Sequence, residues 1–227
     1  MLVYGKQSVY YLIEHHAKKI QKLYLAKDID KKEYSRLMKH DFEIKRIPQN
    51  AAVSMSKSGN HQGFLAEIEP LPRLSVADLK EPEFVVILSS LTDVGNIGAI
   101  VRTAYALGVD AVIVTGLKSL NFENVARTSS GALFDMPLVV ENNIHDVIND
   151  LKTQGFGMYG AVLEGEDIRG LHVKGKRALI LGSEGYGLSS RVVNKLDKKI
   201  KIQMQHDFDS LNVSAAGAIL IDRMRDE

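Results

Sequence analysis

Polar side chains gather just before an apolar run near the carboxyl end of the sequence. Ser210, Asn212 and Ser214 precede the run Ala215–Ile221, which we predict to be a helix. Hydroxyl and amide oxygens at such a position accept hydrogen bonds from the first N–H groups of a helix. Taken alone, the pattern favours capping. Two segments upstream favour a ligand site for the same residues.

The first upstream segment reads Leu-Thr-Asp-Val-Gly-Asn-Ile-Gly-Ala-Ile-Val-Arg over residues 91–102. A strand, a glycine turn and a helix in this order are typical of a dinucleotide site. The spacing Gly95-x-x-Gly98 lacks the leading glycine of that motif, however, and no acid ends the following strand. Asn96 is either a helix cap or a ligand-binding amide, and Arg102 is either a surface ion-pair partner or an anion-binding group.

The second upstream segment reads Leu-Gly-Ser-Glu-Gly-Tyr-Gly over residues 181–187. Three glycines allow a ligand to approach the backbone closely, although a simple turn explains them equally well. The presence of Glu184 needs a separate explanation, because a turn does not require a carboxylate at its centre.

Other chemistries are poorly supported by the sequence. No His pair, carboxylate pair or H-E-x-x-H spacing indicates a metal site. A Ser-His-Asp triad would have to recruit His145 or His172, neither of which has a motif context. The chain contains no cysteine, which excludes disulfides, thiolate metal sites and a cysteine nucleophile. The lack of cysteine also fits a reducing, cytoplasmic environment, as does the absence of a signal peptide or a long apolar span.

Alternating apolar runs and helical patterns in residues 83–227 predict the elements that position these three segments. The expected strands are residues 84–88, 111–114, 138–140, 157–162 and 178–181, with helices at 96–107 and 144–151. This rhythm predicts an α/β fold with a parallel sheet covered by helices on both faces. Ligands of such sheets bind at the carboxyl ends of the strands, where the three segments lie.

Residues 1–67 form a separate small α/β domain in this interpretation. Helical spacing covers residues 2–13 and 33–40, and strands are expected within 18–26, 42–47 and 61–68. A linker follows at residues 68–82, which contain three of the five prolines. Residues 1–66 hold 12 Lys+Arg against 6 Asp+Glu, and the remainder holds 17 against 22. A basic domain beside an acidic one predicts contact with a polyanion.

Taken together, the three segments resemble the motifs of the SpoU (TrmH-type) family of SPOUT RNA methyltransferases. The family's Asn-x-Gly-x-x-x-Arg motif matches residues 96–102, its Leu-Gly-x-Glu-x-x-Gly motif matches residues 181–187, and its Ser-Leu-Asn-Val-Ser motif matches residues 210–214. Tyr4-Gly5-Lys6 and His61-Gln62-Gly63 resemble the family's N-terminal RNA-binding domain of the ribosomal-protein L30e type. The likeness therefore covers nearly the whole chain.

The resemblance implies a methyltransferase that uses S-adenosyl-L-methionine to methylate a ribose 2′-hydroxyl in RNA. Guanosine in 23S rRNA is the favoured target, and tRNA is the alternative. A deep C-terminal trefoil knot and a homodimer with its site at the subunit interface are also implied. The family's catalytic positions fall on Asn96, Arg102, Glu184, Ser210 and Asn212. Its cofactor positions fall on Gly182, Ile202 and Leu211, with Leu181 and Met204 lining the same site.

Three positions depart from the family pattern. Val94 and Gln203 stand where prolines are usual, and His206 stands where a glycine is usual. A competing interpretation is therefore an RNA-binding module of the same fold without catalysis. A nucleotide-dependent oxidoreductase is a third possibility, which the missing glycine pattern weakens.

Overall fold

The structure, a computed structural model, describes residues 1–183, 185–206 and 210–225 and divides into two compact units. The first unit contains residues 1–72 together with residues 121–134, and the second contains the rest of the chain. The division after Pro72 falls inside the expected linker. Residues 121–134, which the sequence placed in the second domain, pack instead with the first unit.

A mixed sheet of four strands forms the centre of the first unit, in the order β1-β4-β2-β3. The β2–β3 pair is parallel and the other two pairs are antiparallel. The elements are β1 (Leu2–Tyr4), α1 (Lys6–His16), η1 (Ala17–Lys19), β2 (Ile20–Leu25), α2 (Lys31–Leu37), β3 (Glu43–Arg46), α3 (Gln49–Met55) and β4 (Phe64–Ile68).

The start of the chain differs from the helix expected over residues 2–13. Residues 2–4 form β1 instead, and α1 begins only at Lys6. Gly5 separates the two elements with a φ of 98°, a conformation that L side chains rarely adopt. Helical spacing of the apolar residues did not reveal this break.

The helix α5 (Phe122–Thr128) and the short helix η3 (Ala132–Phe134) complete the first unit. The Ser8 hydroxyl donates to the Ala126 carbonyl oxygen at 3.0 Å, and the Leu2 N–H donates to a Glu123 carboxylate oxygen at 3.2 Å. The Tyr4 hydroxyl also donates to the Asn124 side chain. These contacts join positions about 120 residues apart, which explains why no sequence pattern announced them.

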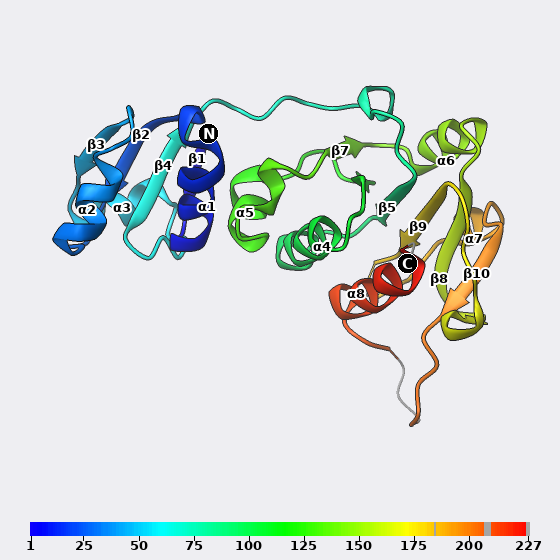
Figure 1. Cartoon of the computed structure of the whole chain (residues 1–227). Coiled ribbons are helices and arrows are strands. Elements are labelled where there is room, and N and C mark those ends of the chain that lie inside the picture. The colour runs from blue at the N-terminus through cyan, green and yellow to red at the C-terminus, as the bar shows by residue number, and fades with distance from the viewer. Residues whose placement is uncertain (184, 207–209, 226–227) are drawn as a thin grey trace. The chain divides into compact units, whose positions relative to one another are not determined.

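Six parallel strands form the sheet of the second unit, in the order β10-β8-β9-β5-β6-β7 (Figure 1). The predicted α/β fold with a parallel sheet is therefore confirmed. The elements are η2 (Val76–Asp78), β5 (Phe84–Ser89), α4 (Val94–Ala106), β6 (Ala111–Thr115), β7 (Leu138–Glu141), α6 (Ile144–Thr153), β8 (Gly157–Asp167), η4 (Ile168–Gly170), β9 (Arg177–Leu181), α7 (Ser190–Val193), β10 (Lys198–Lys201) and α8 (Val213–Met224).

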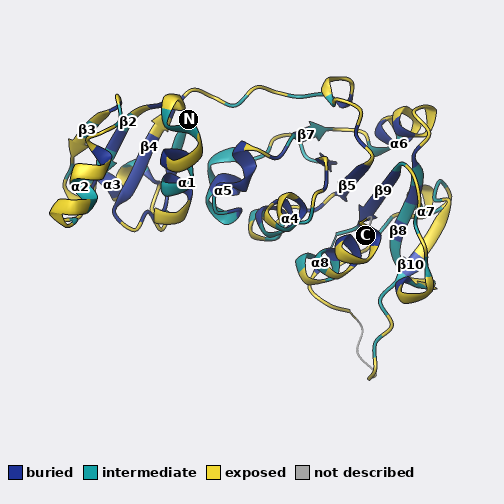
Figure 2. Cartoon of the chain, viewed as in Figure 1, coloured by how far each residue is buried: buried dark blue, intermediate teal, exposed yellow. Residues whose placement is uncertain are grey.

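Helices cover both faces of this sheet. Val85, Ile87 and Ile180 belong to one buried cluster with Ile148 of α6 and Val192 of α7. Because side chains alternate along a strand, the intervening residues face the opposite side, where α8 packs against α4 and β9. Figure 2 shows the consequence: β5 and β9 are buried along their whole lengths. Among the described residues, no helix combines the length and hydropathy required to cross a membrane.

The edge strand β10 leads into the segment at residue 202 and is fixed closely against β8. A Cβ atom built on Gly165 of β8 would lie only 2.5 Å from the carbonyl carbon of Ile200 in β10, so a side chain would push the strands apart. Asp197 precedes β10 and accepts hydrogen bonds from the Met158 N–H at 2.8 Å and from Lys152 Nζ at 2.9 Å.

The Asp197 carboxylate should stabilise the fold in a pH-dependent way. Burial acts to raise its pKa, but the Lys152 ammonium and the Met158 N–H outweigh burial and hold the pKa below its ordinary value. A lowered folded-state pKa stabilises the protein above the unfolded-state pKa, near 4, and this contribution disappears as the pH falls through the folded value. Asp197→Asn should cost about 1 kcal/mol at pH 7, or about 2–4 °C in Tm.

Thermal unfolding of both proteins from pH 7 down to pH 3 provides the measurement. The gap between the two melting temperatures should narrow as the pH falls below about 4. A gap that stays constant over this range would show that the charge of Asp197 does not matter.

Candidate functional site

The three predicted segments follow β5, β9 and β10 of the second unit, at the carboxyl ends of these strands. The strands β5 and β9 are neighbours, with Leu88 paired to Leu181, so the segments that follow them begin side by side. The third segment leaves β10 and leads into α8, which packs against both α4 and β9. The parallel arrangement therefore brings the described residues of the three segments (91–102, 181–183, 185–187, 202–206 and 210–214) to one end of the sheet.

A hydrogen bond between two asparagines joins the first segment to the third. Asn212 Nδ2 donates to Asn96 Oδ1 at 3.1 Å across 116 residues of sequence. At the other end of the same amide, Asn212 Oδ1 accepts from the Ser214 N–H at 2.9 Å and caps α8. Because the cap fixes the oxygen end of the amide, the nitrogen end is the one presented to Asn96. Asn212 is thus both a helix cap and a cross-link.

Asn96 is not the cap of its own helix. The helix α4 begins at Val94, two residues before the expected start, and Asp93 is its cap: Asp93 Oδ1 accepts from the Asn96 N–H at 2.7 Å. The family's usual proline would stand at Val94, the first helical position, where proline is favoured but not required. The Asp93 cap therefore starts the helix without it and leaves the side chain of Asn96 available to Asn212.

The second segment is folded closely on itself around Gly182. A Cβ atom built on Gly182 would lie 2.3 Å from the carbonyl carbon of Gly187. The Gly187 N–H donates to the Ser183 carbonyl oxygen at 2.9 Å, which closes the turn. Only glycine fits at 182, because the obstacle is backbone.

A second glycine, which the sequence patterns did not indicate, brings α8 close to β9, the strand that ends at Leu181. A Cβ atom on Gly217 would lie 3.1 Å from Leu181 Cδ1 and 3.6 Å from Ile100 Cγ1. Glycine in the middle of an apolar helix is the signal that could have identified it, since such a glycine usually has a packing reason.

The other predicted residues occupy varied environments. Leu181 is buried, Ile202 and Met204 are half-buried, and Ser210 and Leu211 are exposed. Gln203, in the second proline position, donates from Nε2 to the Met204 carbonyl oxygen at 3.1 Å. Glu184 lies outside the described residues.

Arg102 lies on the exposed side of α4. Six residues separate it from Asn96, which corresponds to about 9 Å along the helix axis and about 120° around it. The two side chains therefore leave α4 in different directions. Among the described residues, no group of three or more His, Asp or Glu side chains has the arrangement of a metal site.

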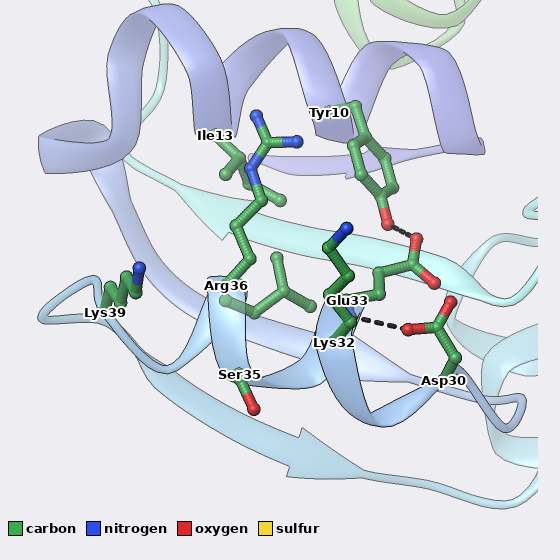
Figure 3. Close-up of a pocket in the computed structure, with 9 residues that line it drawn as sticks. Tyr10, Ile13, Asp30, Lys32, Glu33, Ser35, Arg36 and Lys39 are labelled. Atoms are coloured by element: carbon green, nitrogen blue, oxygen red, sulfur yellow. Dashed lines mark hydrogen bonds between the residues drawn. The ribbon is translucent and has the colours of Figure 1, made fainter.

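A pocket of about 680 Å³ lies between α1 and α2 of the first unit (Figure 3). Tyr10 points from α1 toward Glu33 and donates a hydrogen bond to it, while Asp30 accepts from the Glu33 N–H at 2.7 Å. Both acids are thus engaged within the protein. Lys32 and Lys39 are exposed on the rim, which leaves the pocket with a cationic edge.

Comparisons with known proteins match both units. The family described as SpoU rRNA Methylase matches residues 83–222, and the one described as RNA 2′-O ribose methyltransferase substrate binding matches residues 2–74. An uncharacterized tRNA/rRNA methyltransferase of Borreliella burgdorferi is 34% identical, covering 88% of this chain and 94% of its own. A Staphylococcus aureus protein assigned to the TrmH family of tRNA/rRNA methyltransferases is 33% identical, over 89% and 86% of the two chains.

Solved structures of low sequence identity share the fold. The SpoU methyltransferase AviRb from Streptomyces viridochromogenes, in complex with AdoMet, superposes with a TM-score of 0.80 at 22% identity, covering 99% of this chain and 88% of that one. An RNA 2′-O ribose methyltransferase superposes with a TM-score of 0.81 at 20% identity, covering 99% and 87%.

The two asparagines should make unequal contributions to stability. Asn212→Ala removes the cap of α8 as well as the bond to Asn96, and we expect it to cost about 1–2 kcal/mol. Asn96→Ala removes the bond between the side chains but leaves the cap of α8 in place, and should cost less. The double variant should lose less stability than the sum of the two single losses, because both single changes delete the same bond.

Urea unfolding of the four proteins gives the coupling energy. Asn143→Ala is a matched control, since Asn143 caps α6 through the His145 N–H without linking two segments. Strictly additive losses at Asn96 and Asn212 would mean that their hydrogen bond contributes nothing.

Proposed function

The chain belongs to the SpoU family of RNA methyltransferases, and from this premise we propose that it methylates a ribose 2′-hydroxyl with S-adenosylmethionine as the methyl donor. The observation that carries the proposal is the Asn212–Asn96 hydrogen bond. It joins the first and third family motifs, and the second motif follows β9, the neighbour of the strand that leads into the first. An RNA-binding module without catalysis would have no need for this convergence.

The local chemistry of the second and third segments fits the cofactor. Gly182 and Gly187 approach closely and carry no side chains, which suits an adenosine moiety held by main-chain hydrogen bonds. Leu181, Ile202, Met204 and Leu211 would add apolar surface around it. When bound, S-adenosylmethionine supplies an electrophilic methyl group whose departure leaves a neutral thioether.

The residues of the chain must position the ribose hydroxyl and manage its proton. Arg102 would clamp a neighbouring phosphate and donate to the oxygen as negative charge develops on it. A guanidinium stays protonated in proteins, so the proton of the hydroxyl leaves to solvent or phosphate rather than to Arg102. Ser210 and Asn212 would orient the ribose, with Asn96 holding Asn212. Glu184 would hold Arg102 or the third segment.

A homodimer is the assembly that suits this site. Arg102 leaves α4 about 120° away from Asn96, so a second copy could bring its own Arg102 to the residues that Asn96 and Asn212 organise. Exposed apolar side chains support a contact on the same two helices, with Tyr105 on α4 and Ile219 on α8. We propose that the complete site lies at this interface.

The chain path is compatible with the knot of the family. The third segment leaves β10 at the edge of the sheet and must pass β8 to reach α8 on β9. We propose that it threads through a loop on the way, and a crystal structure that traces residues 202–212 tests the crossing.

The RNA target that we favour is a guanosine of 23S rRNA. The N-terminal unit supports this choice, because its match to a substrate-binding family and its excess of basic residues suit a large folded RNA. The curated relatives carry both tRNA and rRNA in their names, so tRNA is the alternative. Transfer of tritiated methyl groups to total RNA from a deletion strain, followed by mapping of the nucleotide, distinguishes the two.

Arg102→Ala should abolish methyl transfer while S-adenosylmethionine binding stays within about twofold of the wild type. The guanidinium contacts the RNA in this proposal, and removing a donor to a developing oxyanion costs about 10²–10³ in kcat. Calorimetry measures cofactor binding and tritium incorporation measures transfer. Arg73→Ala, an exposed arginine beside the linker, is the matched control.

A mixing experiment separates catalysis within one protomer from catalysis across the dimer. Refolding Arg102→Ala together with Asn212→Ala should restore about a quarter of the wild-type activity, since half of the dimers would be mixed and each would hold one intact site. Near-normal turnover by Arg102→Ala alone would refute its catalytic role. A mixture that stays inactive would refute its action across the interface.

Charge reversal at the rim of the first-unit pocket should weaken RNA binding. Lys32→Glu combined with Lys39→Glu should lower affinity for rRNA about tenfold or more at moderate salt and flatten the salt dependence, because fewer phosphates are neutralised. Lys80→Glu with Lys174→Glu makes the same charge change on exposed positions of the second unit. Equal losses in both pairs would show a nonspecific charge effect instead of an RNA surface.

A further inference from the structure

The ring of Tyr186 is almost completely exposed to solvent. Its exposed fraction is 96%, against 76% for Leu163, the next most exposed large apolar side chain among the described residues. Tyrosine normally buries much of its ring and leaves only the hydroxyl in water. An aromatic ring presented in this way has both faces available to a flat partner.

A hydrogen bond closes the turn that contains Tyr186. The Gly187 N–H donates to the Ser183 carbonyl oxygen at 2.9 Å, and the same two residues form an antiparallel bridge. Gly187 has a φ of 62°, a conformation that favours glycine. Tyr186 lies within the turn that this bond closes, and its side chain projects into solvent.

The turn that carries this ring packs against a position of the proposed cofactor site. Gly187, the next residue, packs its backbone against Gly182, which is one of the predicted cofactor positions. In a nucleotide the base is bonded to C1′, the carbon next to the one that carries the 2′-hydroxyl. A ring that holds the base of the methylated nucleotide must therefore stand next to the cofactor site, as Tyr186 does.

We propose that Tyr186 stacks on an unpaired nucleobase of the RNA, at or next to the nucleotide that is methylated. The inference rests on the proposed function and adds a positioning residue to it. Stacking on an aromatic side chain is the usual way in which proteins hold splayed-out bases, and it tolerates different bases because each has a π-face. The stacked base fixes the ribose so that its hydroxyl points toward the methyl donor.

A base fits this ring better than a second protein copy does. Tyr186 is flanked by the exposed Gly185 and Gly187. The half-buried Leu188 packs against the core, and the exposed Ser189 follows it. These neighbours provide no apolar patch, whereas the core of a protein interface is contiguous and apolar. The flanking glycines instead leave room for a flat ligand to reach the ring.

The chain contains no tryptophan, so Tyr186→Trp creates a single fluorescent reporter at this position. Addition of a short single-stranded RNA to the full-length variant with cofactor should quench its emission, because the indole stacks on a base. Polyphosphate, a polyanion without bases, should not quench it. Leu163→Trp serves as the control reporter at another exposed site and should respond to neither. Equal responses of Tyr186→Trp to RNA and polyphosphate would overturn the proposal.

Steady-state methylation kinetics on rRNA from a deletion strain provide a second test. Tyr186→Ala should raise the KM for RNA about 5- to 150-fold, which corresponds to the loss of one stacked base, with a smaller fall in kcat. Tyr186→Phe should restore the wild-type KM, and the affinity for S-adenosylmethionine should not change. Leu163→Ala is the matched deletion of an exposed apolar side chain and should leave the KM unaltered.

The outcomes separate this inference from the proposed function. A wild-type enzyme that methylates RNA, with a Tyr186→Ala variant of unchanged KM, overturns the stacking role alone. A Tyr186→Ala variant that sediments at half the wild-type mass overturns it in favour of a subunit contact. A wild-type protein that binds no S-adenosylmethionine and transfers no methyl group overturns the proposed function, whereas base-specific quenching in that protein would still support stacking.

Discussion

The side-chain amide of Asn212 holds two helix starts together. Its oxygen receives the Ser214 N–H at the beginning of α8, and its nitrogen donates to Asn96 in the first turn of α4. An amide is the smallest side-chain group that offers an acceptor and a donor at fixed angles. An aspartate could cap α8 equally well but would place a carboxylate oxygen against Asn96 Oδ1. The position therefore requires more than a cap, because the same amide also links the first segment to the third.

Close packing of backbone supplies the second constraint on the site. Gly182 meets the backbone of Gly187, and Gly217 lets α8 approach Leu181. Neither contact contributes a functional group of its own. Glycine has no side chain, so each position allows two segments to pack closely where any side chain would hold them apart. The asparagine bond fixes one side of the site, and these approaches fix the other.

The strands of the second unit could be predicted because they are continuous apolar runs. Residues 84–88 and 178–181 are buried on both faces, which leaves no polar residue to interrupt the pattern. The three motifs could be recognised from residue types and order, whereas the roles of their residues stay predictions. The role of Asp93 could not, because Asp93 and Asn96 are both good caps and only the observed start of α4 chooses between them. The Asn96–Asn212 bond spans 116 residues, and no local pattern reports a contact of that range.

The helix α5 illustrates the same limit and has a consequence for biosynthesis. Because residues 121–134 belong to the first unit, the chain passes between the units after residues 72, 120 and 134 rather than once. A ribosome makes the first 72 residues well before the helix that bonds to Leu2, Tyr4 and Ser8. Domains at the amino end usually fold as they emerge. Here the first unit must wait until β5, α4 and β6 of the second have been synthesised, so its completion during translation is tied to the synthesis of two of the six strands of the other sheet.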